Sequence, residues 1–491
     1  MEPIATAALL AAAGALLIAA AATSTLSQRL GVPALLVVLA VGMLAGSEGI
    51  GGIPFSDYAL AFRLGTIALV LILFDGGLGT PYAAFRSVAV RAGALASVGV
   101  LLTAAITAGI GIALGLSPAL AVLVGAVVSS TDAAAVFSVL RGSGMRLKER
   151  TGATLEVESG LNDPMAILLT VGATEVMLGK QALGLDLALL AVRQLVLGAA
   201  GGVAVGLAGR FLLRVMVLPA AGLYAAVTVA LAFVAFGVPT LLDGSGFLAV
   251  YVAGLVLAGG PMPYRAGIRR VHDALAWLAQ LSMFLMLGLL VFPSRMLAVA
   301  PVGILLGGAL ALVARPVAVL ATMMPFRAPW RERMFVAWVG LRGAVPIVLA
   351  AYPVLRGVAE GDAIFHLVFF VVLVNSIVPG ATVARLARRW QLTTRAPTSA
   401  PASVELVSLR DYPGEFVWYT IDRASAVAGA SVHELPLPDG CVLTLFLRDA
   451  AVLAPRGDTK VLPGDHVCVF VTHEDRPFLD LLFGGGDEDA E

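Results

Sequence analysis

The chain has 491 residues, of which 59% are hydrophobic and 13% are charged. Soluble proteins carry about a quarter charged residues, so this composition excludes a soluble enzyme and indicates a polytopic membrane protein. The formal net charge is zero and no basic tract is interleaved with aromatic residues, which gives no support to a nucleic-acid-binding function. The two cysteines, Cys441 and Cys468, lack the spacing of a disulfide framework or a zinc site.

Thirteen apolar segments, bounded by glycine, proline and charged residues, predict transmembrane helices. The first carries Glu2 in place of the basic residues of a signal peptide, so we interpret it as a first span. The predicted spans are 4–23, 32–47, 60–79, 88–115, 119–139, 151–177, 183–213, 221–237, 246–260, 271–292, 296–323, 333–356 and 362–387.

The loops between these spans differ in positive charge. Fifteen Lys and Arg residues follow odd-numbered spans, whereas only Arg63, Lys180 and Arg295 follow even-numbered ones. Because positively charged loops stay in the cytoplasm, we expect the odd loops inside, the N-terminus outside and the C-terminal region inside the cell membrane.

Polar runs interrupt two of the spans. Ser129–Asp132 breaks the span 119–139, and Gly340–Gly343, followed by Pro346, breaks the span 333–356. Interrupted helices in corresponding places of two halves are typical of the binding sites of secondary transporters. These two are the fifth spans of 1–6 and of 8–13, and the odd offset between the two units allows an inverted repeat.

The composition changes beyond the last span. The predicted domains are a transmembrane domain at 1–390, a flexible linker at 391–403 and a small β-rich α+β domain at 404–485. An acidic tail from Gly484 is expected to be disordered. The predicted strands are Val404–Ser408, Glu415–Ile421, Cys441–Arg448 and His466–Thr472.

A polar cluster lies inside the predicted span 151–177. At helical spacing Glu158 and Asn162 share one face, as do Ser159 and Asp163. Pro164 cannot donate a backbone hydrogen bond within the helix, which leaves a carbonyl oxygen free beside these side chains. Ionisable groups at this depth are costly and usually mark a site for an ion or a proton.

Oxygen atoms are the ligands that hard monovalent cations prefer. We expect Asp163 and Ser159, together with Thr131 and Asp132 of the first interrupted span, to form such a site. Competition of the cation with a proton for Asp163 would then couple the two ions. Asp75, at the end of its span, is either a further ligand or a solvated helix terminus.

The guanidinium of Arg342 requires a buried counter-ion. We predict Glu158 as that partner, with Asn162 bridging them. An inert ion-pair network is the alternative and accounts for these three residues, but it leaves Asp163 without a cation. Glu156 reads as an interfacial or capping charge, and Arg315 as a residue that snorkels or pairs structurally.

In combination these motifs resemble the NhaP-type monovalent cation:proton antiporters over about residues 1–390. The motifs are Glu158-Ser159-Gly160-Leu161-Asn162-Asp163-Pro164, Ser130-Thr131-Asp132 and Gly340-Leu341-Arg342-Gly343-Ala344-Val345. The resemblance implies thirteen helices in two inverted six-helix repeats with two broken, crossing helices, a homodimer, and a core domain that moves in elevator fashion.

The same resemblance implies roles for the site residues. Asp163 would carry the cation or proton, Thr131, Asp132 and Ser159 would complete the site, and Glu158 and Arg342 would orient Asn162. An Asn-Asp pair marks the electroneutral class of the family. Many members have Glu where this chain has Asp75, which is a shorter acid.

The segment from Ala424 to about His473 resembles the C-terminal regulatory domain of the TrkA/RCK type. Its pairing with an antiporter domain favours potassium over sodium as the cation. No GxGxxG motif accompanies it, so the nucleotide-binding half of that module is expected to be absent. Some relatives bind a cyclic dinucleotide, so regulation of this domain by a bound nucleotide stays an alternative.

The sequence therefore predicts a secondary transporter, not an enzyme, with no catalytic residues, resident metal or required cofactor. It would exchange potassium or sodium for protons across the cell membrane. Two other functions stay open: a gated cation channel, although no TVGYG-like filter occurs, and a sodium-coupled solute symporter.

Overall fold

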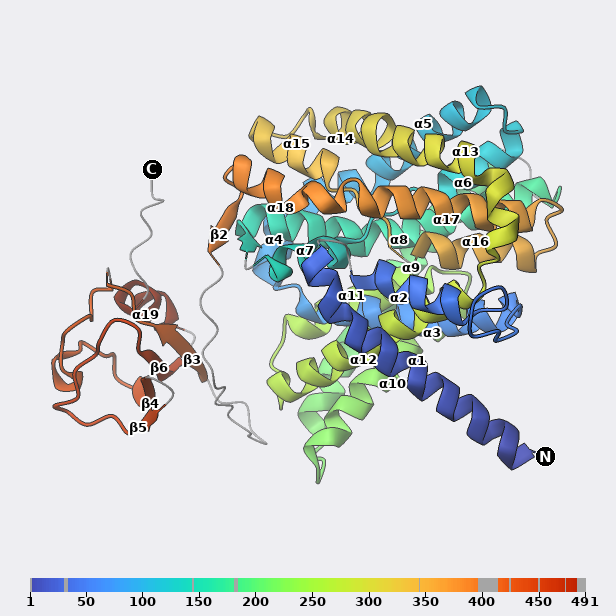
Figure 1. The fold of residues 1–491 in the computed structure, drawn as a ribbon. Helices are drawn as coiled ribbons and strands as arrows, with labels where there is room; N and C mark the ends of the chain where they lie inside the picture. Colours follow the sequence, from blue (N-terminus) through green and yellow to red (C-terminus); the bar gives the residue numbers. More distant parts are fainter. Residues whose placement is uncertain are drawn as a thin grey trace. The chain divides into compact units, whose positions relative to one another are not determined.

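The computed structural model describes residues 2–30, 34–143, 145–180, 184–343, 345–395, 414–423, 425–448, 451–472 and 474–483. The chain divides into two compact units. The first, Met1–Gly260 with Gly267–Thr394, is almost entirely helical; the second, Pro261–Ala266 with Arg395–Glu491, contains an antiparallel sheet (Figure 1).

Helices cover all thirteen predicted spans. Seven helical stretches among the described residues are long and apolar enough to cross a membrane, and several further helices are apolar but shorter. Thirteen crossings therefore stay a prediction. The helices are α1 (Glu2–Leu30), α2 (Ala34–Ala45), α3 (Tyr58–Gly79), α4 (Tyr82–Ala94), α5 (Val100–Ala113), α6 (Pro118–Val127), α7 (Ala133–Gly142), α8 (Glu149–Met177), α9 (Leu185–Val215), α10 (Ala221–Leu241), α11 (Gly246–Ala258), α12 (Arg265–Leu289), α13 (Pro293–Ala309), α14 (Arg315–Met323), α15 (Trp330–Trp338), α16 (Val345–Leu355), α17 (Gly361–Ile377) and α18 (Gly380–Arg389).

Both predicted interruptions are present. The backbone is non-helical at residues 128–132, between α6 and α7, and again at residues 339–343, after α15. The Asp132 backbone N–H of the first unwound segment donates a hydrogen bond of 2.8 Å to the Leu341 carbonyl of the second. The two unwound segments therefore contact each other, and each satisfies backbone groups that the other leaves unpaired.

A second irregularity precedes each interruption. A π-helical segment, Leu95–Gly99, joins α4 to α5, and another, Leu310–Ala314, joins α13 to α14. Such segments are frequent at functional sites. In both halves the order is a π segment followed by an interrupted helix.

Glycines bring helices of the first unit, called the membrane unit below, into backbone contact. A Cβ atom at Gly42 of α2 would lie 3.0 Å from the Gly288 Cα atom of α12, and one at Gly77 of α3 would lie 3.1 Å from the Gly254 Cα atom of α11. Larger residues at these positions would force the helices apart. Close backbone approach of this kind replaces the hydrophobic driving force that membrane helices lack.

The second unit contains a four-stranded antiparallel sheet of order β3-β6-β4-β5, built from β3 (Gly414–Thr420), β4 (Val442–Arg448), β5 (Ala451–Leu453) and β6 (His466–Thr472), with α19 (Arg476–Phe483). Three predicted strands are confirmed. The sequence missed the short β5, and the predicted strand Val404–Ser408 and the acidic tail lie outside the described residues. A separate two-stranded pairing joins β1 (Met145–Leu147) to β2 (Thr393–Arg395).

The second unit contains a buried carboxylate and two buried cysteines. The buried Asp465 carboxylate accepts two hydrogen bonds of 2.7 Å from Arg448 and one of 2.8 Å from the Leu462 N–H. Both cysteines are buried free thiols, and burial raises the pKa of Cys441 and of Cys468 above the usual value.

Candidate ion-binding site

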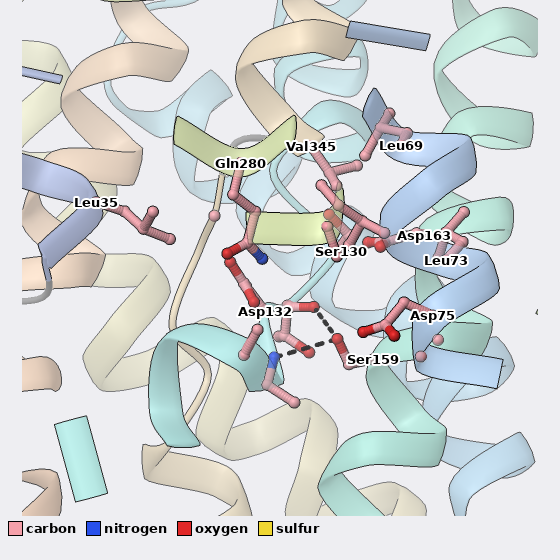
Figure 2. Close-up of a pocket in the computed structure, with 18 of the residues that line it drawn as sticks. Leu35, Leu69, Leu73, Asp75, Ser130, Asp132, Ser159, Asp163, Gln280 and Val345 are labelled. Atoms are coloured by element: carbon pink, nitrogen blue, oxygen red, sulfur yellow. Dashed lines mark hydrogen bonds between the residues drawn. The ribbon is translucent and has the colours of Figure 1, made fainter. Parts of the chain in front are cut away.

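A cavity of about 240 Å³ lies among α3, α8, α11, α12, the first interruption and the start of α16. All five residues that the sequence predicts as cation or proton ligands line it: Asp75, Thr131, Asp132, Ser159 and Asp163. Figure 2 shows Asp75, Ser159 and Asp163 gathered on one side of this space, with Ser130 beside Asp163.

Ser159 and Asn162 of α8 hold the first unwound segment in place. The Ser159 hydroxyl donates to the Thr131 carbonyl (3.0 Å) and accepts from the Ala133 N–H (3.1 Å), as Figure 2 shows. The Asn162 amide donates to the Thr131 hydroxyl oxygen at 2.6 Å. Because α8 is continuous here, these three bonds hold Thr131 of the unwound segment and Ala133 at the start of α7 in fixed positions beside the cavity.

Asp132 caps α7 and also contacts the second interruption. Its carboxylate accepts a hydrogen bond of 3.1 Å from the Ala135 N–H, as an N-cap residue does. A Cβ atom added to Gly343 would overlap this carboxylate. Glycine at 343 therefore makes room for Asp132, and the two interruptions together determine where that side chain lies.

Asp163 lies next to Ser130 and has no fixed positive partner. Its side chain is 8% exposed, and Asp163 Oδ1 and Ser130 Oγ have no hydrogen-bond partner among the described residues. No described Lys or Arg forms an ion pair with it, and the Asp132 carboxylate lines the same cavity. A bound cation or proton would neutralise the Asp163 charge and give its unpartnered oxygen a partner.

The predicted pairing of Arg342 with Glu158, bridged by Asn162, is wrong. Arg342, 1% exposed, donates from Nε to the Val128 carbonyl (2.8 Å) and from Nη1 to the Gly340 carbonyl (3.0 Å). Its guanidinium thus binds backbone oxygens at both interruptions. Those carbonyls lack helical partners, and a delocalised cation with several donors can satisfy them together.

Glu158 instead forms its ion pair with Arg315 of α14, at 2.7 Å between Oε1 and Nη1, and both side chains are almost fully buried. The Arg315 side chain also packs against Gly340, where a Cβ atom would lie 2.9 Å from Arg315 Cγ. Arg315 is therefore a buried partner and does not snorkel. The sequence places Arg315 deep in an apolar span, directly before Pro316, which indicates a buried charge but does not name its partner.

Sequence reasoning did not place several other residues in the cavity. Glu156, Tyr251, Asp273 and Gln280 also line it. Glu156 precedes Ser159 by three residues and Asp163 by seven, so helical spacing puts all three on one face. Asp273 and Gln280 are likewise seven residues apart on α12, but no pattern in the sequence shows which helix faces α8.

Comparison with known proteins gives the identity of this helical unit. A family model described as sodium/hydrogen exchanger, transmembrane, matches residues 15–389, and a TrkA-C domain model matches residues 416–480. The chain belongs to the sodium/hydrogen exchanger family. It is accordingly a monovalent cation/proton antiporter, a membrane transporter rather than an enzyme, with a TrkA-C domain after its membrane unit.

Relatives align over nearly the whole antiporter. It is 38% identical to the K(+)/H(+) antiporter NhaP of Alkalimonas amylolytica over 93% of this chain and 80% of that protein. It is 39% identical to K(+)/H(+) antiporter NhaP2 of Shewanella baltica over 95% and 81%, respectively. The fold matches the sodium proton antiporter MjNhaP1 of Methanocaldococcus jannaschii at pH 8, with a TM-score of 0.68 and 22% identity over 79% of this chain and 99% of that one.

Proposed function

We propose that this antiporter exchanges one potassium ion for one proton without net charge movement, with Asp163 as the carrier of both. The observation that supports this is a buried carboxylate on a cavity wall with no ion-pair partner among the described residues. Both nearby arginines are engaged elsewhere, Arg315 by Glu158 and Arg342 by backbone carbonyls. A single carboxylate that binds either ion enforces exchange, because only one can occupy it at a time.

The cation would be held by oxygen atoms of Asp163, Ser159 and Thr131, with Asp132 and Asp75 supplying negative charge around it. Glu158, Arg342 and Asn162 would keep these ligands in position. The Asn162 side chain is an amide that donates to Thr131, and because an amide does not titrate, position 162 adds no second proton carrier beside Asp163. One titrating carrier for one monovalent ion fits electroneutral exchange.

Potassium is favoured over sodium because relatives 38–40% identical to this chain are named K(+)/H(+) antiporters and because a TrkA-C domain follows the membrane unit. Sodium stays the second candidate, since the structurally similar MjNhaP1 is named a sodium proton antiporter. Initial exchange rates with potassium, sodium and lithium at several pH values would rank the three ions.

We expect the membrane unit to work as a homodimer of two inverted six-helix repeats whose interrupted helices cross. One group of helices would move past the other in elevator fashion. The N-terminus would lie outside and the TrkA-C domain in the cytoplasm. Cysteine accessibility from each side of the membrane would test this orientation, and an externally labelled position 430 would contradict it.

The test of the carrier is Asp163→Asn in proteoliposomes. Potassium addition should dissipate a pH gradient in the parent protein and not in the variant, because an amide binds neither ion exchangeably. Asp186→Asn, at an exposed helix start, is the matched control and should exchange normally. Exchange that persists in Asp163→Asn contradicts the proposal.

A gated channel and a sodium-coupled symporter, the two other functions, predict different observations. A gated channel would give current driven by the membrane potential, and a sodium-coupled symporter would need an organic substrate for uptake. Electroneutral exchange predicts a rate independent of an imposed potential. A rate that changes with the potential would refute electroneutrality while leaving the site intact.

The TrkA-C domain would regulate transport, with a nucleotide as the candidate ligand class. A chain truncated after residue 400 should still exchange potassium for protons but with an altered dependence on pH or ion concentration. Loss of all exchange in a truncated protein that inserts correctly would instead make this domain part of the transport machinery.

A further inference from the structure

The cavity holds more carboxylates than exchange at Asp163 requires. Glu156 and Asp273 line it together with Asp75 and the two acids of the proposed site. Glu156 and Asp163 lie on one face of α8, seven residues or about 10 Å apart along the helix axis. Two carboxylates separated by two helical turns therefore face the same space.

Glu156 lies against the end of α3. Its Oε1 atom would be 3.8 Å from a Cβ atom placed on Gly79, the last residue of that helix, and Thr80 follows directly. The final carbonyls of a helix lack helical partners and carry partial negative charge. The carboxylate and the helix end thus form a negative environment at one part of the cavity wall.

Tyr251 supplies an observation that is independent of charge. Its side chain is 1% exposed, and its hydroxyl has no hydrogen bond of normal geometry to any described residue, although Thr80 and Glu156 lie near it. The ring occupies the space where Gly160 lacks a side chain, midway between Glu156 and Asp163 on α8. Buried tyrosine hydroxyls normally have a partner, so this hydroxyl has a hydrogen-bonding capacity that the described residues leave unused.

Among the described residues, no Lys or Arg forms an ion pair with the carboxylates of this part of the cavity. Arg269 of α12 acts on both Asp75 and Glu156, but it is exposed and forms no ion pair with either in the part of the chain that the structure describes. The loop charges assign this end of α12 to the cytoplasm. The unneutralised carboxylate and the unpartnered hydroxyl therefore lie on the side from which a cytoplasmic cation would arrive.

We propose that Glu156, the Tyr251 hydroxyl and the end of α3 form a second binding site for a monovalent metal cation. The ion occupies this site before it moves two helical turns along α8 to Asp163. Oxygen atoms of a carboxylate and a phenol replace part of its hydration shell, and water completes it. The assignment depends on the proposed exchange at Asp163, for which Glu156 loads the ion.

Transport kinetics test the loading step. Tyr251→Phe keeps the ring against Gly160 and removes only the hydroxyl, so the apparent KM for potassium should rise about threefold, and Glu156→Gln should raise it about tenfold, with little change in maximal rate. Tyr224→Phe is the matched control, because that buried hydroxyl bonds to backbone atoms of residues 216 and 218. An unchanged KM in both cavity variants overturns the proposal.

Equilibrium binding separates the second site from the first. Purified full-length Asp163→Asn protein should no longer exchange ions but should still bind radioactive rubidium, and adding Glu156→Gln should abolish that binding. Rubidium binding that is absent in Asp163→Asn, or that survives Glu156→Gln, overturns the second site and leaves the carrier role of Asp163 standing. Exchange by Asp163→Asn would instead refute the carrier.

Discussion

The two helix interruptions differ in the polar and charged side chains that their unwound segments carry. The first, between α6 and α7, contributes Thr131 and Asp132 to the cavity and carries no positive charge. The second, between α15 and α16, carries Arg342, whose guanidinium is turned onto backbone carbonyls of both segments. One interruption thus places oxygen-bearing side chains on the cavity wall, and the other carries a fixed positive charge.

This division explains how an ion site can remain open. If the arginine of the second interruption reached Asp163, it would act as a permanent substitute for the transported cation. Two of its donors, Nε and Nη1, instead bind the Val128 and Gly340 carbonyls, and Glu158 forms its ion pair with Arg315. Arg315 is therefore paired with Glu158, Arg342 is bound to backbone oxygens, and neither arginine forms an ion pair with Asp163 among the described residues.

The largest effect should come from the contact between the two interruptions. In Gly343→Ala the new methyl group would overlap the Asp132 carboxylate, and exchange should fall about a hundredfold, since displacements of about 1 Å have such effects at precise sites. Gly308→Ala, where a Cβ atom meets open space, is the control. Normal exchange by Gly343→Ala would show that the interruptions are not coupled in this way.

The second expected effect is on stability. Arg315→Met leaves Glu158 buried without its partner and should destabilise the protein by about 3–5 kcal/mol, measured by thermal unfolding in detergent. Adding Glu158→Gln should recover part of that loss.

A double-mutant cycle distinguishes the two arginines. The coupling energy of Glu158 should be larger with Arg315 than with Arg342, because only the former makes the 2.7 Å ion pair. Equal or reversed coupling energies would restore the pairing with Arg342 that the sequence suggested.

The smallest effect should come from Ser159→Ala. It removes the two hydrogen bonds between α8 and the first interruption, which together are worth about 1–3 kcal/mol, so the apparent KM for the cation should rise. Ser138→Ala is the control, because that hydroxyl also lines the cavity but bonds only within its own helix. Similar KM values for the two variants would contradict the role assigned to Ser159.

Most of the fold could be predicted because it follows from one-dimensional patterns. The length of each apolar segment indicates where a helix forms. The polar runs at 129–132 and 340–343 indicate where the backbone leaves the helical conformation. In the small sheet, a strand-like run after the turn signal Pro463-Gly464-Asp465 predicted β6, whereas β5 has only three residues, too few for such a run.

For the candidate site, the sequence predicts which residues of one helix share a face, but it does not predict which residues of different helices meet. Ser159, Asn162 and Asp163 follow from spacing on α8, and helical spacing could also have added Glu156 to the same face. The partner of Glu158 could not be chosen, since two buried arginines on different helices compete and only packing decides between them. The same limit kept Asp273 and Tyr251 of the facing helices out of the prediction.

The location of the two cysteines has a practical consequence. Both belong to the sheet domain, where burial keeps their thiols protonated and poorly reactive near neutral pH. The membrane unit is therefore a natural cysteine-free background. Spectroscopic probes or crosslinkers introduced singly along α8, α11 and α12 would report on transport-related motion in the otherwise unmodified protein.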